Sequence, residues 1–156
     1  MSLFPLFGVA PKAAAGASND DARMSAKRGS NQAITTATAT KCQFDTETFD
    51  PKGDYDNATN YRYTPSVAGV YLVSITPTLT DVGDGKFAYG QIRKNGSTIM
   101  TGYKGNGMAI DTTVGGAFLV EMNGTTDYLE AFVYHNHGSN RNLSASGWLD
   151  IHRLGA

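Results

Sequence analysis

The chain carries one histidine pair whose spacing could serve a metal or a substrate. His135 and His137 flank Asn136, and this triplet shares its letters with a nuclease motif. That nuclease chemistry requires a ββα-metal arrangement, which the strand-rich pattern around the triplet does not supply. If three subunits met on a threefold axis, the same histidine of each subunit could surround the axis, and three imidazoles are suitable ligands for a borderline cation. A solvated loop is the favoured interpretation, so we expect no metal site here.

The sequence offers no familiar catalytic arrangement. Asp150 and His152 fall on one strand face with Trp148, but a catalytic triad also needs a serine on a sharp turn, and the Gly-x-Ser-x-Gly pattern is absent. Carboxylates at 50–56 and 81–85 lack the alternating ligand pattern of a calcium loop. There is no phosphate-binding loop and no dinucleotide fingerprint. We therefore expect a non-enzymatic protein without a cofactor, in which Asp150 and His152 form a satisfied polar pair at an interface.

Composition sets limits on the fold and on the partners. With 156 residues, 18 glycines and 17% charged residues, the chain fits one domain of an all-β fold that is rich in turns. A net charge of -1 gives no electrostatic support for nucleic-acid binding. The single cysteine, Cys42, excludes an internal disulfide. No apolar run approaches the roughly 18 residues of a membrane span, so we expect neither nucleic acid nor membrane as a partner.

The elements that would position these residues are β-strands. Residues 115–134 contain two apolar, β-prone runs around the turn-forming segment 123–127, which is the pattern of an antiparallel hairpin. Alternation along the second run places bulky residues on both faces. We expect one face in the core and the aromatic face against a second layer or a second subunit. The first face carries Leu129, Ala131 and Val133, and the aromatic face carries Tyr128, Glu130, Phe132 and Tyr134.

Further strands are predicted at regular intervals along the chain. The clearest are 69–75, 87–94 and 146–153, and Asn95-Gly96 is a strong hairpin signal directly after the second of them. Several short strands separated by turns, about ten residues apart, predict a sandwich or a barrel.

Residues 1–33 differ from the rest, and we expect them to form an extended N-terminal arm before a domain at 34–156. The tract 12–31 has too little apolar surface to fold by itself. The arm is either an anchor whose apolar tip docks on another protein, or a frayed tail or short edge strand on the domain. An exposed apolar cluster tends to have a partner, which supports the anchor. The tip contains Leu3, Phe4, Leu6, Phe7 and Val9.

Several short motifs follow one another in a specific order. They are Phe44-Asp45, Tyr61-Arg-Tyr-Thr-Pro65, Gly69-Val-Tyr-Leu72, Arg93-Lys-Asn-Gly96, Gly115-Gly116, Asp127-Tyr-Leu129 and Ser146-Gly-Trp-Leu149. With these motifs the chain resembles, over about residues 34–154, the globular head of complement subcomponent q, in the jelly-roll superfamily shared with tumour necrosis factor. The resemblance implies a ten-strand jelly-roll sandwich that trimerises about a threefold axis and has a binding or structural role.

The chain also departs from the secreted animal members of that family. No Gly-X-Y stalk precedes the domain, and the N-terminus lacks the pattern of a secretion signal. Domains of this kind look like those on virions of tailed bacteriophages, as fibre tips, head fibres or capsid decorations. By this analogy we expect a homotrimeric virion structural protein, assembled in the host cytoplasm and anchored to a capsid or tail protein through its arm.

Two surfaces are expected to contact partners. In the structural interpretation, the trimer interface is the aromatic strand face, with Trp148 as a further member of the set. The alternative is a receptor- or glycan-binding tip for host attachment, whose ligand would contact exposed loops. The interface residues are Tyr128, Phe132, Tyr134 and Trp148, and the candidate loop contacts are Tyr103, Asn136 and Asn140.

Overall fold

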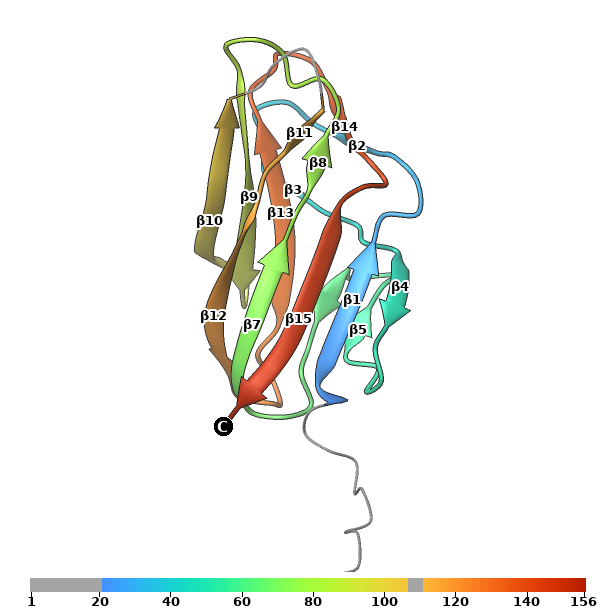
Figure 1. Ribbon diagram of the computed structural model, residues 1–156, viewed down its shortest axis with the longest axis vertical. Helices are drawn as coiled ribbons and strands as arrows, with labels where there is room; N and C mark the ends of the chain where they lie inside the picture. Colours follow the sequence, from blue (N-terminus) through green and yellow to red (C-terminus); the bar gives the residue numbers. More distant parts are fainter. Residues whose placement is uncertain (1–20, 107–110) are drawn as a thin grey trace, which may run out of the picture.

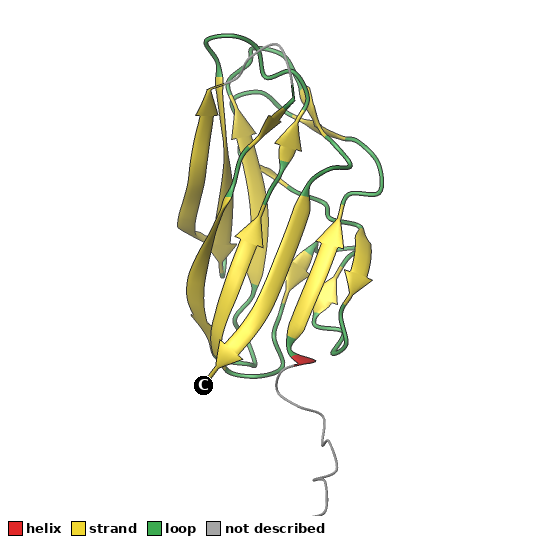
Figure 2. Ribbon diagram, viewed as in Figure 1, coloured by secondary structure: helices red, strands yellow, loops and turns green. Residues whose placement is uncertain are grey.

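The described part of the chain folds almost entirely into β-strands. The computed structural model describes residues 21–106 and 111–156, and apart from a short helical turn at the start Figure 2 shows only strands and connecting loops in this part. None of these residues belongs to a helix that is long and apolar enough to cross a membrane. The expected all-β fold is confirmed.

The longest strands form two antiparallel sheets, which lie one behind the other in Figure 1. We call them the β7 sheet and the β13 sheet after a central strand of each. The β7 sheet has the order β12 (Gly116–Met122), β7 (Gly69–Ile75), β15 (Trp148–Gly155), β1 (Arg23–Lys27) and β4 (Thr46–Phe49). The β13 sheet has the order β10 (Ser97–Asn106), β9 (Phe87–Lys94), β13 (Leu129–His135), β6 (Arg62–Tyr63) and β5 (Tyr55–Asp56), and β3 (Thr40–Lys41) also pairs with β13.

A third, smaller sheet lies at the upper end of the sandwich in Figure 1. Its strands are β11 (Thr112–Thr113), β8 (Thr78–Leu79), β14 (Arg141–Leu143) and β2 (Gln32–Ile34), in that order. The described residues contain 15 strands, more than the ten expected, because several of them are only two or three residues long. The layered antiparallel arrangement is that of the predicted jelly-roll sandwich.

The core lies between the two large sheets and follows from the alternation of each strand. Tyr71 and Val73 are fully buried from β7, and Ala131 and Val133 are buried from β13. The predicted division of the second hairpin strand is confirmed, since its aliphatic face is buried while Phe132 on the other face is only half-buried.

Three backbone positions in two turns explain where the strands turn. Asn95 and Gly96 have φ values of 52° and 81°, which is the two-residue hairpin geometry that the sequence predicted between β9 and β10. Gly115, just before β12, has a φ of 152°. A Cβ atom added there would lie 1.9 Å from the carbonyl oxygen of Ile75, so only glycine fits between β7 and β12.

The folded domain begins earlier in the chain than the sequence suggested. β1 lies inside the β7 sheet, between β15 and β4, and β2 pairs with β14. Met24 and Ala26 of β1 are fully buried. The boundary predicted at residue 33 is therefore corrected, because the sheet extends at least to Arg23. The predicted arm tip, Leu3, Phe4, Leu6, Phe7 and Val9, lies outside the described residues.

Candidate functional site

The outer face of the β13 sheet carries aromatic rings that are covered by cations. The guanidinium of Arg93 lies over the ring of Phe132, with Cζ 3.8 Å from the ring centroid, and Lys41 Nζ lies 6.0 Å from the same centroid. Arg62 lies over the ring of Tyr128, with Cζ 4.8 Å from its centroid. Such cation–π contacts are attractive because the ring face carries negative charge. The rings are therefore shielded from water by side chains of their own chain.

The cations on this face differ in their polar partners. Lys41 Nζ lies 2.6 Å from Glu130 Oε1 and also donates to the backbone oxygen of Asn60. The side chains of Arg62 and Arg93 form no ion pair with another residue among 21–106 and 111–156. Arg93 Nε is moreover buried without a hydrogen-bond acceptor. Two guanidinium groups on one face are thus left without a carboxylate from the described chain.

An aromatic stack continues the same face towards the upper end of the molecule. Tyr89 and Tyr134 are paired between β9 and β13, with ring centroids 4.8 Å apart and planes 9° from parallel. Phe87 stacks on Tyr134 at 5.8 Å. Because these rings cover one another's faces, less ring surface is available to a partner.

The outer face of the β7 sheet differs, because it exposes aliphatic side chains among a few charged ones, and only its aromatic rings are covered by cations, Phe49 by Arg23 at 5.9 Å and Trp148 by Lys27. Leu72 and Leu119 pair directly between β7 and β12 and are 39% and 60% exposed. Phe49, at the β4 edge, is 45% exposed. Exposed apolar patches of this kind mark interaction sites. Sequence reasoning did not select these three residues, although Leu72 and Leu119 alternate with residues of their own strands that pack on the core.

The four residues predicted as a trimer interface do not share one face. Trp148 begins β15 and lies on the outer side of the β7 sheet beside Lys27, whose Nζ is 5.4 Å from the indole centroid. The other three lie on the outer side of the β13 sheet, or at its edge. The predicted set, which also comprises Tyr128, Phe132 and Tyr134, thus spans two outer faces, and its role as a trimer interface stays a prediction.

Asp150 and His152 lie on the outer face of the β7 sheet but are not hydrogen-bonded to each other. Asp150 Oδ1 accepts a hydrogen bond of 2.6 Å from Ser25 Oγ. His152 instead helps to line a shallow hollow of about 130 Å³ together with Leu72 and Phe49. The expected polar pair is thus replaced by a serine–aspartate contact beside an apolar depression.

His135 is a core residue rather than a loop residue. Its side chain is fully buried, Nε2 lies 3.1 Å from the backbone oxygen of Ile34, and Nδ1 accepts from the backbone N–H of His137. A carbonyl oxygen only accepts, so Nε2 carries the proton and the ring is neutral. Burial is the main cause that lowers the pKa of His135 below 6.5. The predicted solvated loop is wrong at this residue.

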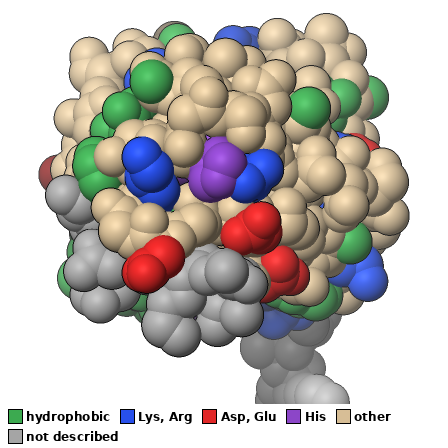
Figure 3. Space-filling model, turned by 90° about the horizontal axis from the view of Figure 1, so that it is seen from above, with side chains coloured by type: hydrophobic (Ala, Val, Ile, Leu, Met, Phe, Trp, Pro, Cys, Tyr) green, Lys and Arg blue, Asp and Glu red, His purple; other side chains and the backbone are tan. Residues whose placement is uncertain are grey.

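Charged and histidine side chains gather at the upper end, which Figure 3 shows from above. His137 contacts the guanidinium of Arg141, and Arg141 also lies 3.5 Å from Asp81. The Nδ1 atom of His137 lies 3.0 Å from Ser139 Oγ. Among residues 21–106 and 111–156, no three histidine, cysteine or carboxylate side chains are grouped in a way that could hold a metal ion.

The amides predicted as ligand contacts hold the backbone of their own domain. Asn136 Oδ1 accepts a hydrogen bond of 2.8 Å from the backbone N–H of Phe87, and Asn140 Oδ1 accepts one of 3.4 Å from Thr36. Tyr103 belongs to β10, but its side chain lies outside the described residues. Both asparagines are partly committed to the fold, and a ligand role for any of the three stays a prediction.

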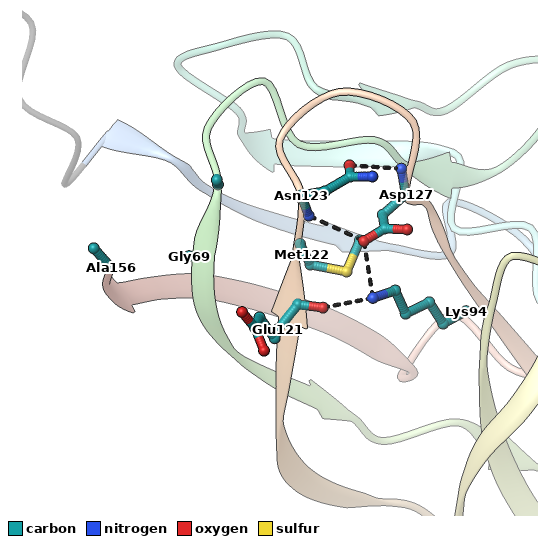
Figure 4. Close-up of a pocket in the computed structure, with 8 residues that line it drawn as sticks. Gly69, Lys94, Glu121, Met122, Asn123, Asp127 and Ala156 are labelled. Carbon is teal, nitrogen blue, oxygen red and sulfur yellow. Dashed lines mark hydrogen bonds and ion pairs between the residues drawn. The ribbon is translucent and has the colours of Figure 1, made fainter.

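A hollow of about 340 Å³ lies at the end of the sandwich where β15 ends, and Figure 4 shows the residues that line it. Lys94 Nζ donates to the backbone oxygen of Glu121 at 2.7 Å and lies 2.8 Å from Asp127 Oδ2. Asp127 also accepts hydrogen bonds from Asn95 and from the backbone of Asn123. The hydrogen bonds from Lys94 and Asn95 lower the pKa of Asp127. These groups join two hairpin turns, so the hollow has a structural role.

Comparisons with known proteins address the fold. No protein-family model matches the chain, and a search of curated proteins finds no relative. Among solved structures, the globular domain of zebrafish complement 1qA protein matches with a TM-score of 0.63 and 12% identity, covering 85% of this chain and 96% of that chain. The Eiger TNF of S. frugiperda matches with a TM-score of 0.58 and 10% identity, covering 85% and 90%. The PRD1 vertex protein P5 matches with a TM-score of 0.59 and 12% identity, covering 85% and 96%. At such identities these likenesses show a shared fold.

Proposed function

We propose that this jelly roll of the complement q and tumour necrosis factor type is a homotrimeric, non-enzymatic structural protein of a tailed-bacteriophage virion. It is displayed on the capsid or tail and is anchored through its N-terminal arm. The observation that carries the proposal is the apolar outer face of the β7 sheet, which one subunit alone leaves exposed. The fold shared with the PRD1 vertex protein P5 supports a virion location by analogy.

Self-association through the β7 sheet follows from the nature of its surface. Leu72, Leu119 and Phe49 are each about half exposed, so burying the remaining surface contributes about half of the roughly 1.5–3 kcal/mol of a fully exposed side chain, before the costs of association. The occupant we propose is a second copy of this chain, because a net charge of -1 produces little repulsion between identical subunits. Trp148 lies on the same face and would extend the contact.

The aromatic face predicted from the sequence is less suited to the threefold contact. Phe132 and Tyr128 are already covered by Arg93 and Arg62. Burying these unpaired guanidinium groups between subunits would cost several kcal/mol, since a desolvated charge needs a partner. We therefore place the interface on the β7 sheet and retain only Trp148 from the predicted set.

The test is the mass of the protein in solution, measured by light scattering after gel filtration. The unchanged chain should have the mass of three 16.6 kDa subunits. Leu119→Glu should give monomers, because each contact would have to bury a new charge. Ile99→Glu is the matched control, since Ile99 is 43% exposed on the β13 sheet and should keep the trimer. A soluble, trimeric Leu119→Glu protein would contradict this interface.

A receptor- or glycan-binding tip is the second candidate function. It is supported by the two guanidinium groups of Arg62 and Arg93, which have no carboxylate partner among the described residues. The two functions are compatible, because the arginines lie on the sheet opposite the proposed trimer face.

A further inference from the structure

We propose that the outer face of the β13 sheet around Phe132 binds an anionic polysaccharide whose sugar units carry carboxylate groups. The inference rests on the second candidate function above and names its ligand class; it concerns the sheet opposite the proposed trimer face and needs no contact between subunits. It rests on the side chains of Arg62 and Arg93, which lie on aromatic rings and have no acidic partner in the described chain.

Both guanidinium groups are held in position before any ligand arrives. Arg93 Cζ lies 3.8 Å from the centroid of Phe132, and Arg62 Cζ lies 4.8 Å from that of Tyr128. A guanidinium group presents its N–H donors in a rigid planar fork that matches a carboxylate with two hydrogen bonds. Since the ring already restricts the arginine, binding costs less side-chain entropy. The face thus presents two preorganised carboxylate-binding groups, which we call the two receptors.

The two receptors lie at the same level of the sheet. Glu130 of β13 pairs with Arg62 on one side and with Arg93 on the other. The two arginines are therefore two strand spacings apart, about 10 Å. Glu130 is matched by Lys41 at 2.6 Å. Asp56, opposite Arg62 on β5, accepts hydrogen bonds from backbone amides of its own turn. The face carries three cations against two carboxylates, and both carboxylates already have partners.

A polymer with repeated carboxylates fits this arrangement better than a single small anion. Receptors about 10 Å apart cannot share one carboxylate. Both hollows described above lie elsewhere, so the ligand meets an open sheet rather than a cleft. A nucleic acid is disfavoured because the chain has a net charge of -1.

The experiment measures binding of the full-length protein to oligosaccharides of polygalacturonate by isothermal titration calorimetry. Dextran oligosaccharides of the same length provide a neutral comparison, and a single-stranded oligonucleotide provides a different polyanion. The double variant Arg62→Gln with Arg93→Gln removes the two receptors. The double variant Lys52→Gln with Lys86→Gln is the matched control, because it removes the same charge at two loop positions outside the strands that carry the arginines.

The unchanged protein should bind polygalacturonate and not dextran. The arginine double variant should bind at least tenfold more weakly, while the lysine double variant should bind within a factor of about two of the unchanged protein. Equal affinity of the arginine variant, equal losses in both variants, absence of binding, or tighter binding of the oligonucleotide would each overturn the proposal. Circular dichroism confirms that each variant is folded. The mass in solution is measured separately, so failure of the trimer and failure of this site are distinguishable.

Discussion

At the scale of single residues, His135 shows how a polar side chain can become part of a hydrophobic core. The polar triplet His135-Asn136-His137 was interpreted as a solvated loop. The ring of His135 is nevertheless fully buried and bridges the carbonyl of Ile34 and the backbone N–H of His137. Both ring nitrogens are used, so burial leaves no polar atom of this side chain unsatisfied. The cost of this arrangement is that the ring must stay neutral.

We expect this requirement to make stability depend on pH. The unfolded chain binds a proton at His135 near the ordinary pKa of 6.5, whereas the folded chain binds it only at lower pH, because burial lowers the pKa. The contribution is therefore complete above about pH 6.5 and is lost as the pH falls through the lowered folded pKa. Thermal melting curves between pH 5 and 8 should show a decrease in Tm that His135→Gln reduces. The control is His152→Gln, which replaces an exposed histidine and should leave the decrease in Tm unchanged. If the unchanged protein and both variants had the same pH profile, the explanation would be contradicted.

At the scale of elements, the close approach of β7 and β12 depends on one glycine. Gly115 has a φ of 152°, and a Cβ atom there would lie 1.9 Å from the oxygen of Ile75. Gly115→Ala should lower the free energy of unfolding by more than about 1 kcal/mol, since the native conformation cannot accept a side chain. Urea titration measures the loss. Gly155→Ala is the control, because an added Cβ there meets no atom within 4 Å, and a loss of equal size in both variants would count against the steric explanation.

The elements also show what could be predicted from the sequence and what could not. The faces of β13 and the Asn95-Gly96 hairpin follow from local alternation and turn chemistry, and both were predicted. β1 was not, because 23–27 is a short run of small and polar residues whose burial arises only from pairing with β15, far along the chain. For the same reason Trp148 was grouped with three residues of the other sheet, since alternation shows which residues share a strand face but not which sheet the strand joins.

At the scale of the whole molecule, the sandwich has two unlike outer faces. One exposes aliphatic side chains and is the face we propose for a copy of the same subunit, and the other is aromatic and cationic and is the face we propose for a polyanion. Figure 1 shows that β1 begins and β15 ends at the same lower end of the sandwich. The loops that follow β13 lie at the opposite end. The described domain therefore meets the proposed anchor at the end opposite these loops.

Because the arm joins the domain at one end, we expect that substitutions in the arm leave the fold and the assembly of the domain unchanged. The double variant Phe4→Asp with Phe7→Asp, made in the full-length chain, should keep its mass in solution but should be lost from purified virions, because a charged tip cannot dock in an apolar site. Quantitative mass spectrometry of the particles measures the incorporated protein. Ala13→Asp with Ala15→Asp adds the same charge behind the tip and should be incorporated normally. Equal incorporation of both variants would count against an anchor at the tip.

The central place of β1 has a mechanical consequence. Antiparallel hydrogen bonds run across the strands, and β1 is bonded on both sides, to β15 and to β4. A force that pulls Arg23 along the axis of β1 would act in shear on the hydrogen bonds to both neighbouring strands at the same time. An edge strand pulled away from its sheet would instead lose its hydrogen bonds one after another. A tether attached to β1 would therefore withstand a larger pulling force, such as drag on a virion, than a tether attached to an edge strand.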